Sequence, residues 1–132
     1  MAATEILVAV VGAHLTGQPL NKQLVEREGR LVKTCHTASE YRLYALKDTV
    51  PPKPGLERVV NETGHAIEVE IWALATEAFG SFVALIPSPL GIGTLRLDDG
   101  SEVKGFICEP YALASAQDIS HFRGWREYLK SL

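Results

Sequence analysis

The sequence has 132 residues, of which 46% are hydrophobic and 22% are charged, and its formal net charge at pH 7 is −3. This length and balance predict one globular domain over residues 1–132, with enough apolar material for a single core. The acidic balance argues against a nucleic-acid-binding surface, and the longest apolar run is far shorter than the roughly 20 residues of a membrane-spanning helix.

The first part of the chain is predicted to be mainly strands. Residues 5–11 form an apolar, β-branched run that is typical of a central strand covered on both faces. Residues 20–28 can form a short helix, and Gly29 is placed to end it. Residues 30–37 and residues 41–46 then follow as two further strands.

A proline-rich stretch separates these strands from the clearest strand in the chain. Residues 49–56 (TVPPKPGL) are predicted to be an irregular loop, because three prolines there lack a backbone donor. Residues 65–74 alternate apolar residues with polar ones such as Glu68 and Glu70. That period of two predicts a strand with one buried face and one solvated face.

The remaining third of the chain is predicted to hold two helices and a hairpin. Residues 75–86 place apolar side chains at helical spacing, with Thr76 as a cap. An Asp-Gly turn at residues 98–100 lies between two strand-like runs and indicates a hairpin. Residues 118–132 read as a closing helix. Strands outnumber helices without regular alternation, which predicts an α+β fold with a mixed or antiparallel sheet.

The segment VVGAHLTGQPLN, residues 10–21, holds the strongest functional candidate. Gly12 permits a sharp turn after the first strand, which leaves the N–H groups of residues 13–15 available to an oxyanion or a carboxylate. His14 at that turn can act as a general acid or base near neutral pH. A histidine that only hydrogen-bonds a loop carbonyl is the alternative, and the residues alone leave it open.

Other chemical sites are weaker. The four histidines show no spacing typical of zinc ligands, so no metal and no cofactor is expected. Cys35 and Cys108 are too few for a disulfide framework, and MAATE lacks the positive region of a signal peptide. These features predict a reduced, cytoplasmic protein. No GxSxG elbow occurs, and GIG at residues 91–93 is not a phosphate-binding loop.

A few polar side chains on the strands have two interpretations each. Glu68 and Glu70 resemble a catalytic carboxylate pair, but the alternation favours a solvated face. Lys104 could add a positive charge to a site, although a strand lysine is usually solvated. Tyr41 and Tyr44 are either site residues or ordinary half-buried strand residues.

Nearly the whole chain, from about residue 6 to about residue 130, resembles the C-terminal domain of allophanate hydrolase. The segments that carry the resemblance are VVGAHLTGQPLN, YRLYAL, VPPKPGLERV, IEVEIWALATEAFGSFVALIPSPLGIGTLRLDDGSEVKGFICEPYAL and DISHFRGWREYL. The resemblance implies a γ-glutamylcyclotransferase-like fold, which is a small mixed or antiparallel β-barrel with flanking helices.

The same resemblance implies a function and a site. It implies a pocket at the turn of residues 12–15 that decarboxylates or binds a small urea-derived carboxylate such as N-carboxycarbamate. His14 matches the histidine of the family's GAHL motif and is the implied catalytic residue. The implied substrate-binding residues are Gly12, Ala13, Leu15, Tyr44, Ile92 and Gly93.

Two other functions stay open. The chain could be a non-catalytic assembly module that docks on a separately encoded amidase or forms a homo-oligomer, with Trp125 and Tyr128 at the interface. Cyclotransferase chemistry on a γ-glutamyl amine is less favoured, because Glu77 lies too early to be its glutamate. The sequence also lacks the Gly-Ser-rich surroundings of a Ser-Ser-Lys amidase, so the chain alone is not expected to release ammonia from allophanate.

Overall fold

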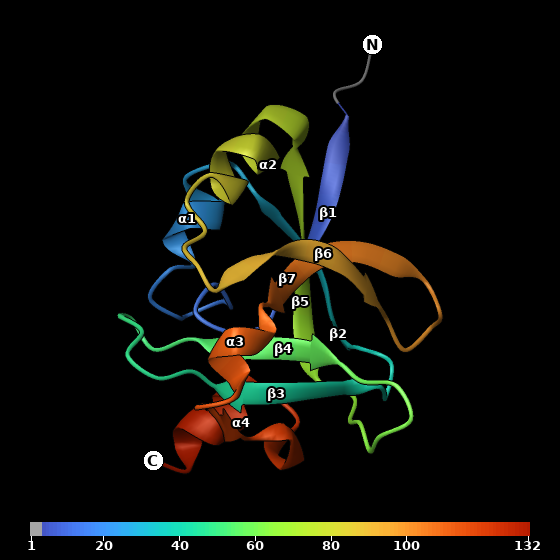
Figure 1. Ribbon diagram of the computed structural model, residues 1–132. Helices are drawn as coiled ribbons and strands as arrows, with labels where there is room; N and C mark the ends of the chain where they lie inside the picture. Colours follow the sequence, from blue (N-terminus) through green and yellow to red (C-terminus); the bar gives the residue numbers. More distant parts are fainter. Residues whose placement is uncertain (1–3) are drawn as a thin grey trace.

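The computed structural model describes residues 4–132, whose strands form two sheets (Figure 1). The five-stranded sheet has the order β2-β5-β1-β7-β6, and the three-stranded sheet has the order β4-β3-β8. The strands are β1 (Glu5–Val10), β2 (Arg30–His36), β3 (Tyr41–Ala45), β4 (Pro54–Arg58), β5 (Glu68–Ala75), β6 (Leu90–Arg96), β7 (Glu102–Cys108) and β8 (Gln117–Asp118). The helices are α1 (Lys22–Val25), α2 (Thr76–Val83), α3 (Pro110–Leu113), the 3-10 helix η1 (Ser120–Phe122) and α4 (Trp125–Lys130).

The mixed α+β class is confirmed, but the sheets do not close into a barrel. Strand β1 pairs antiparallel with β5 and parallel with β7, so the large sheet is mixed. Strands β3 and β4 run crosswise to β1 and β5 (Figure 1) and pair with each other and with β8. The helices are short and lie at the ends and faces of the two sheets.

Strand β1 is central in the large sheet, as its apolar run predicts. Val8 and Val10 are fully buried, whereas Leu7 is 44% exposed. Both faces are therefore covered only over the second half of the strand. That half leads directly into the turn that carries His14.

Two predictions about the first half of the chain need correction. The proline-rich stretch is not wholly irregular, because Pro54 opens β4, where a strand tolerates a residue without an N–H. The predicted helix over residues 20–28 is reduced to α1. It is followed by Glu28 in the left-handed region at φ 57, so Glu28 rather than Gly29 takes the conformation that ends it.

The solvated face predicted for β5 is also wrong. Glu70 is 3% exposed and Trp72 is 6% exposed, because the loop after β1 and the C-terminal segment cover that face. After β5, helix α2 forms as predicted but is shorter. Thr76 is its first residue and donates its hydroxyl to the carbonyl of Thr4, so it does not cap the helix.

The hairpin of β6 and β7 is confirmed, with its turn at Asp98–Gly100. The closing helix is broken into β8, η1 and α4, because Arg123 takes a left-handed φ of 61. Trp125 at the start of α4 is 3% exposed and belongs to the core. It is therefore unavailable for the interface that the sequence suggested.

Both thiols are free, and burial raises the pKa of Cys108 to about 11. Over residues 4–132, the helices are too short or too polar to cross a membrane.

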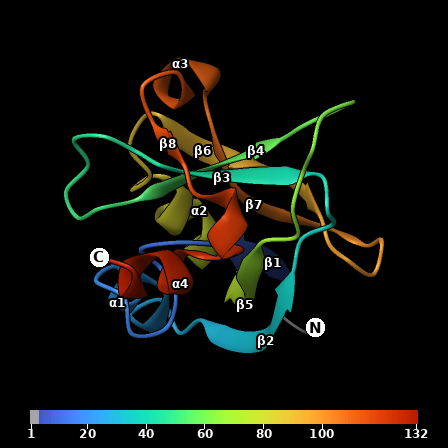
Figure 2. The same ribbon diagram turned by 90° about the horizontal axis from the view of Figure 1, so that it is seen from below.

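A buried ion pair between Glu70 and Arg126 joins three distant parts of the chain. One of them is α4, which lies at the end of the molecule that faces the viewer in Figure 2. Glu70 Oε1 accepts hydrogen bonds from the N–H and hydroxyl of Thr16 at 2.9 and 3.0 Å, and from Trp72 Nε1 at 3.1 Å. Glu70 Oε2 accepts one from Arg126 at 2.8 Å, and Arg126 also donates to the carbonyl of Thr16. Burial alone would raise the pKa of Glu70, but these hydrogen bonds outweigh it and lower the pKa.

We expect Arg126→Ala to lower the free energy of unfolding by about 2 kcal/mol in urea denaturation at pH 7, because it leaves Glu70 charged and buried. The figure is modest because the Arg126 side chain is 29% exposed. Lys130→Ala is the control. It removes an exposed pair with Glu127 on the same helix and should cost less than about 0.5 kcal/mol. Equal losses from both variants would contradict a structural role for the buried pair.

The same ion pair predicts an acid dependence of stability. The pKa of folded Glu70 lies below the 4.5 of the ordinary group. Its stabilisation is therefore complete above pH 4.5 and is lost as the pH falls through the folded pKa. Urea denaturation of the wild type and of Glu70→Gln between pH 3 and 7 measures this. The free energy of unfolding should depend on pH less steeply in the variant, and parallel curves would contradict the assignment.

Candidate functional site

The turn after β1 is held rigidly by its own carbonyl groups. The carbonyls of Gly12, Ala13 and His14 each accept a hydrogen bond. Their donors are the N–H of Leu15 at 3.0 Å, the N–H of Leu20 at 2.8 Å and the side-chain amide of Asn21 at 2.9 Å. This loop therefore presents a fixed surface at the end of the central strand.

Two N–H groups of the turn remain available. Within residues 4–132, the N–H groups of Ala13 and His14 donate to no protein acceptor, whereas that of Leu15 is used inside the turn. Free neighbouring amides in a loop can bind an anion without adding a formal charge. The sequence predicts three such groups, and the structure leaves two.

Gly12 is required for a different reason from the one expected. Its φ lies outside the left-handed region, so the turn does not depend on glycine's conformational freedom. A Cβ at this position would instead overlap the ring of Pro54, whose Cδ and Cγ pack directly on the Gly12 backbone. The glycine is what lets β4 approach the end of β1, which brings Lys53 beside His14.

His14 is 7% exposed and packs against two aromatic rings that also contact each other. Its ring centroid is 5.1 Å from that of Phe82 and 4.9 Å from that of Phe106. Nε2 is 2.8 Å from Gln23 Oε1, which can only accept, so Nε2 carries the hydrogen of the neutral ring. Nδ1 is then the acceptor, and it makes no hydrogen bond to the described chain.

The neutral form of His14 is favoured by its surroundings. Burial lowers the pKa from 6.5, the hydrogen bond to Gln23 raises it, and the charge of Lys53 lowers it further, with a net decrease. The neutral ring of His14 is consequently the main form at pH 7. It can accept a hydrogen bond or a proton at Nδ1, but it does not carry a positive charge to the site.

Lys53 is the site residue that the sequence analysis missed. It is 7% exposed, and burial lowers its pKa. Its ammonium lies 3.4 Å from the carbonyls of Val50 and Pro51, which is long for a hydrogen bond. The available signal was its position in VPPKPG, where prolines on both sides stiffen the backbone that holds the side chain.

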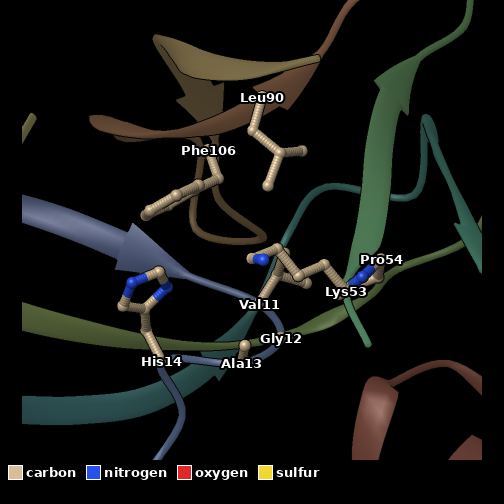
Figure 3. Close-up of a pocket in the computed structure, with 8 residues that line it drawn as sticks. All are labelled: Val11, Gly12, Ala13, His14, Lys53, Pro54, Leu90 and Phe106. Atoms are coloured by element: carbon tan, nitrogen blue, oxygen red, sulfur yellow. The ribbon is translucent and has the colours of Figure 1, made fainter. Parts of the chain in front are cut away.

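These groups surround a narrow recess, in which Lys53 extends toward His14 and Phe106 (Figure 3). The recess itself holds about 10 Å³, enough for about one water molecule. Its lining residues are Val11, Gly12, Ala13, His14, Lys53, Pro54, Leu90 and Phe106. Two neighbouring cavities, of about 200 and 190 Å³, also touch Lys53 and Leu90, and the second also touches His14. Together they suit a small molecule.

The structure brings together only part of the predicted site. Gly12, Ala13 and His14 line the recess. The other four predicted residues line none of these three cavities. Leu15 is fully buried in the core, the Tyr44 hydroxyl donates to Glu57, and Ile92 and Gly93 lie within β6.

The other polar candidates lie elsewhere. The ammonium of Lys104 donates to Thr94 at 3.0 Å, and this pair lines a different surface hollow, beside β1. Glu68 and Glu70 both pair with Arg126. Within residues 4–132, no three His, Cys, Asp or Glu side chains lie close enough together to hold a metal ion.

Comparisons with known proteins agree with one another. The family model of the allophanate hydrolase C-terminal domain matches residues 6–130. Urea amidolyase of Saccharomyces cerevisiae is 41% identical over 133 residues, covering 98% of this chain and 7% of its own. The structure of Kluyveromyces lactis allophanate hydrolase gives a TM-score of 0.93 at 40% identity, covering 97% of this chain and 21% of that one. A protein specific to uropathogenic E. coli gives 0.88 at 34% identity, with 98% of each chain covered.

We expect Gly12→Ala to lower the free energy of unfolding by about 2 kcal/mol, because the methyl group forces Pro54 away from the turn. Gly91→Ala on β6 is the matched control, since a Cβ there meets nothing within 4 Å. It should change stability by less than about 0.5 kcal/mol. Urea denaturation of both variants measures the difference, and a Gly12→Ala chain as stable as the control would contradict the close packing.

We also expect the pKa of His14 to lie below 6.5 in an NMR titration, with the signal assigned by its loss in His14→Asn. Gln23→Leu removes the hydrogen bond that raises the pKa and should lower it further. Because unfolded His14 binds a proton more readily, the stability linked to it is complete above pH 6.5 and is lost as the pH falls through the folded pKa. A pKa of 6.5 or higher would contradict the neutral buried ring.

Proposed function

The chain belongs to the allophanate hydrolase C-terminal domain family, and from this premise we propose that it binds a small urea-derived carboxylate beside His14 and promotes its decarboxylation. N-carboxycarbamate is the proposed substrate. The observation that carries the proposal is His14 itself, a neutral imidazole at a recess edged by free backbone N–H groups. The chain spans about 7% of the length of the S. cerevisiae relative.

The proposed reaction needs positioning more than a nucleophile. N-carboxycarbamate carries a carboxylate on each side of one N–H. When the bond from nitrogen to one carboxyl carbon breaks, carbon dioxide leaves, the electron pair stays on nitrogen and nitrogen takes up a proton, leaving carbamate. A site that holds both carboxylates in fixed positions and stabilises the charge growing on nitrogen speeds this step.

His14 is proposed to orient the substrate. Its Nε2–H is held by Gln23, which fixes the ring and leaves Nδ1 as an acceptor for the substrate N–H. The N–H groups of Ala13 and His14 are proposed to hold a carboxylate oxygen. Phe82 and Phe106 exclude water from the ring, which strengthens each of these contacts.

A coupled assay tests this function. An amidase that cleaves allophanate is run with and without the chain, and release of carbon dioxide is followed against release of ammonia. We expect the wild type to shorten the lag between the two and His14→Asn to lose that effect. Lys104→Ala should behave as wild type, because Lys104 lies outside the recess. Equal lags with wild type and His14→Asn would refute the catalytic role.

A second candidate function is assembly with a separate amidase. It is supported by relatives in which the matching segment is a small part of a longer enzyme. Strand β2 forms one edge of the large sheet and exposes Leu31 and Val32 by 42% and 40%, which suits contact with another chain. Size-exclusion chromatography of the mixed proteins tests it. Co-elution that survives in His14→Asn, without any effect on the lag, would favour assembly alone.

A further inference from the structure

We propose that Lys53 is the anion-binding residue of the His14 pocket, where its ammonium pairs with one carboxylate of the ligand and makes the pocket select dianions over neutral analogues. The proposal rests on the proposed function in placing a carboxylate ligand in this pocket. It adds a residue, a charge and a basis for specificity that the GAHL turn does not contain.

The Lys53 ammonium has no counter-charge within the described part of the chain. The residue is 7% exposed, and no ion pair found among residues 4–132 includes it. Among the described residues, the acceptors of its ammonium are the carbonyls of Val50 and Pro51, both at 3.4 Å. A buried lysine is costly unless it is paired, so an anion in the pocket would relieve that cost.

The described residues place no carboxylate in the lining of the recess. The recess and the cavity of about 190 Å³ that also touches His14 have no acidic residue in their lining. The cavity of about 200 Å³ has one, Asp48. Asp48 makes no salt bridge to Lys53 within the described chain. The negative charge that complements Lys53 is therefore left for the ligand to supply.

The contrast with Glu70 shows that this chain does pair buried charges where the fold requires it. Glu70 is equally buried and receives hydrogen bonds from three residues, including an ion pair at 2.8 Å. Among residues 4–132, Lys53 has no ion-pair partner, although it is buried as well. A charge kept unpaired at a cavity wall is typical of a binding residue, because stability is given up there for affinity.

The placement of Lys53 complements the other groups of the site. It reaches into the recess from the start of β4, whereas the free N–H groups and His14 belong to the turn after β1 (Figure 3). A dicarboxylate can thus be held at one carboxylate by Lys53 and at the other by the turn amides. Lys53 also carries the proton that the substrate nitrogen needs when carbon dioxide leaves. His14 Nδ1 carries none in the tautomer set by Gln23.

Calorimetry with malonate as the dianion and malonamide as its neutral analogue tests the proposal. We expect the wild type to bind malonate at least about tenfold more tightly than malonamide, the value of one charge-assisted hydrogen bond. Lys53→Met should remove that preference, and Lys53→Arg should retain most of it. Lys104→Met is the matched control, because it removes an exposed lysine outside the pocket and should leave both affinities unchanged.

Thermal unfolding separates binding from a structural role. Without ligand, Lys53→Met should melt at the wild-type temperature or higher, because an unpaired buried charge has been removed. Malonate should raise the midpoint of the wild type and not that of the variant. A Lys53→Met chain that is much less stable without ligand would show that the ammonium serves the fold, and would overturn the proposal.

The failure of this inference differs from the failure of the proposed function. If Lys53→Met binds malonate as the wild type does while His14→Asn loses binding, Lys53 is not the anion-binding residue and the proposed function stands. If the wild type binds neither compound and leaves the lag of the coupled assay unchanged, the proposed function fails and the Lys53 inference fails with it.

Discussion

The packing of Pro54 on the bare backbone of Gly12 is the contact on which the site depends. Gly12 lies in the turn that follows β1 of the large sheet, and Pro54 is the first residue of β4 in the small sheet. Their approach places Lys53 beside His14, and any side chain at residue 12 would separate them. The recess therefore exists because one residue lacks a Cβ and the facing residue has a rigid ring.

The two buried charges, Glu70 and Lys53, have different roles in this fold. Glu70 is fully satisfied and ties the turn after β1 to β5 and α4 through Arg126, so its role is to hold the loop of His14 in place. Within residues 4–132, Lys53 has no ion-pair partner and donates to two carbonyls at 3.4 Å, and it lines a cavity. A buried charge is costly without a partner. Glu70 has its partners within the protein and stabilises the fold, whereas the proposed partner of Lys53 is a ligand. The assignment of His14 as a neutral acceptor follows from the same surroundings.

Family membership gives these local observations their context. The matching domain is a small part of the yeast enzymes but nearly all of the E. coli chain. The fold is thus found both joined to other domains and in a chain of about this length. A pocket whose polar groups come from within residues 11–106 is compatible with either arrangement, because no neighbouring domain is needed to form it.

By itself, the sequence determined the elements whose signals are local. Adjacent residues encode the apolar run of β1, the Asp-Gly hairpin of β6 and β7, and the turn that carries His14. The mixed α+β class follows from these elements. Tertiary structure alone decided what depends on distant partners. The predicted solvated face of β5 became buried because Thr16 and Arg126 cover Glu70 from segments 54 and 56 residues away. Periodicity reports which way a side chain points, but not what lies there.

The site shows the same division. His14 could be selected from its turn and from the GAHL motif, whereas its lowered pKa required the two phenylalanines and Lys53 to be in place. Lys53 lies 39 positions along the chain from His14, in a stretch that the sequence marked only as a loop. Its burial, its missing counter-charge and its approach to the turn arise from packing between two sheets. A one-dimensional pattern does not encode such packing, because it is set by which surfaces meet when the chain folds.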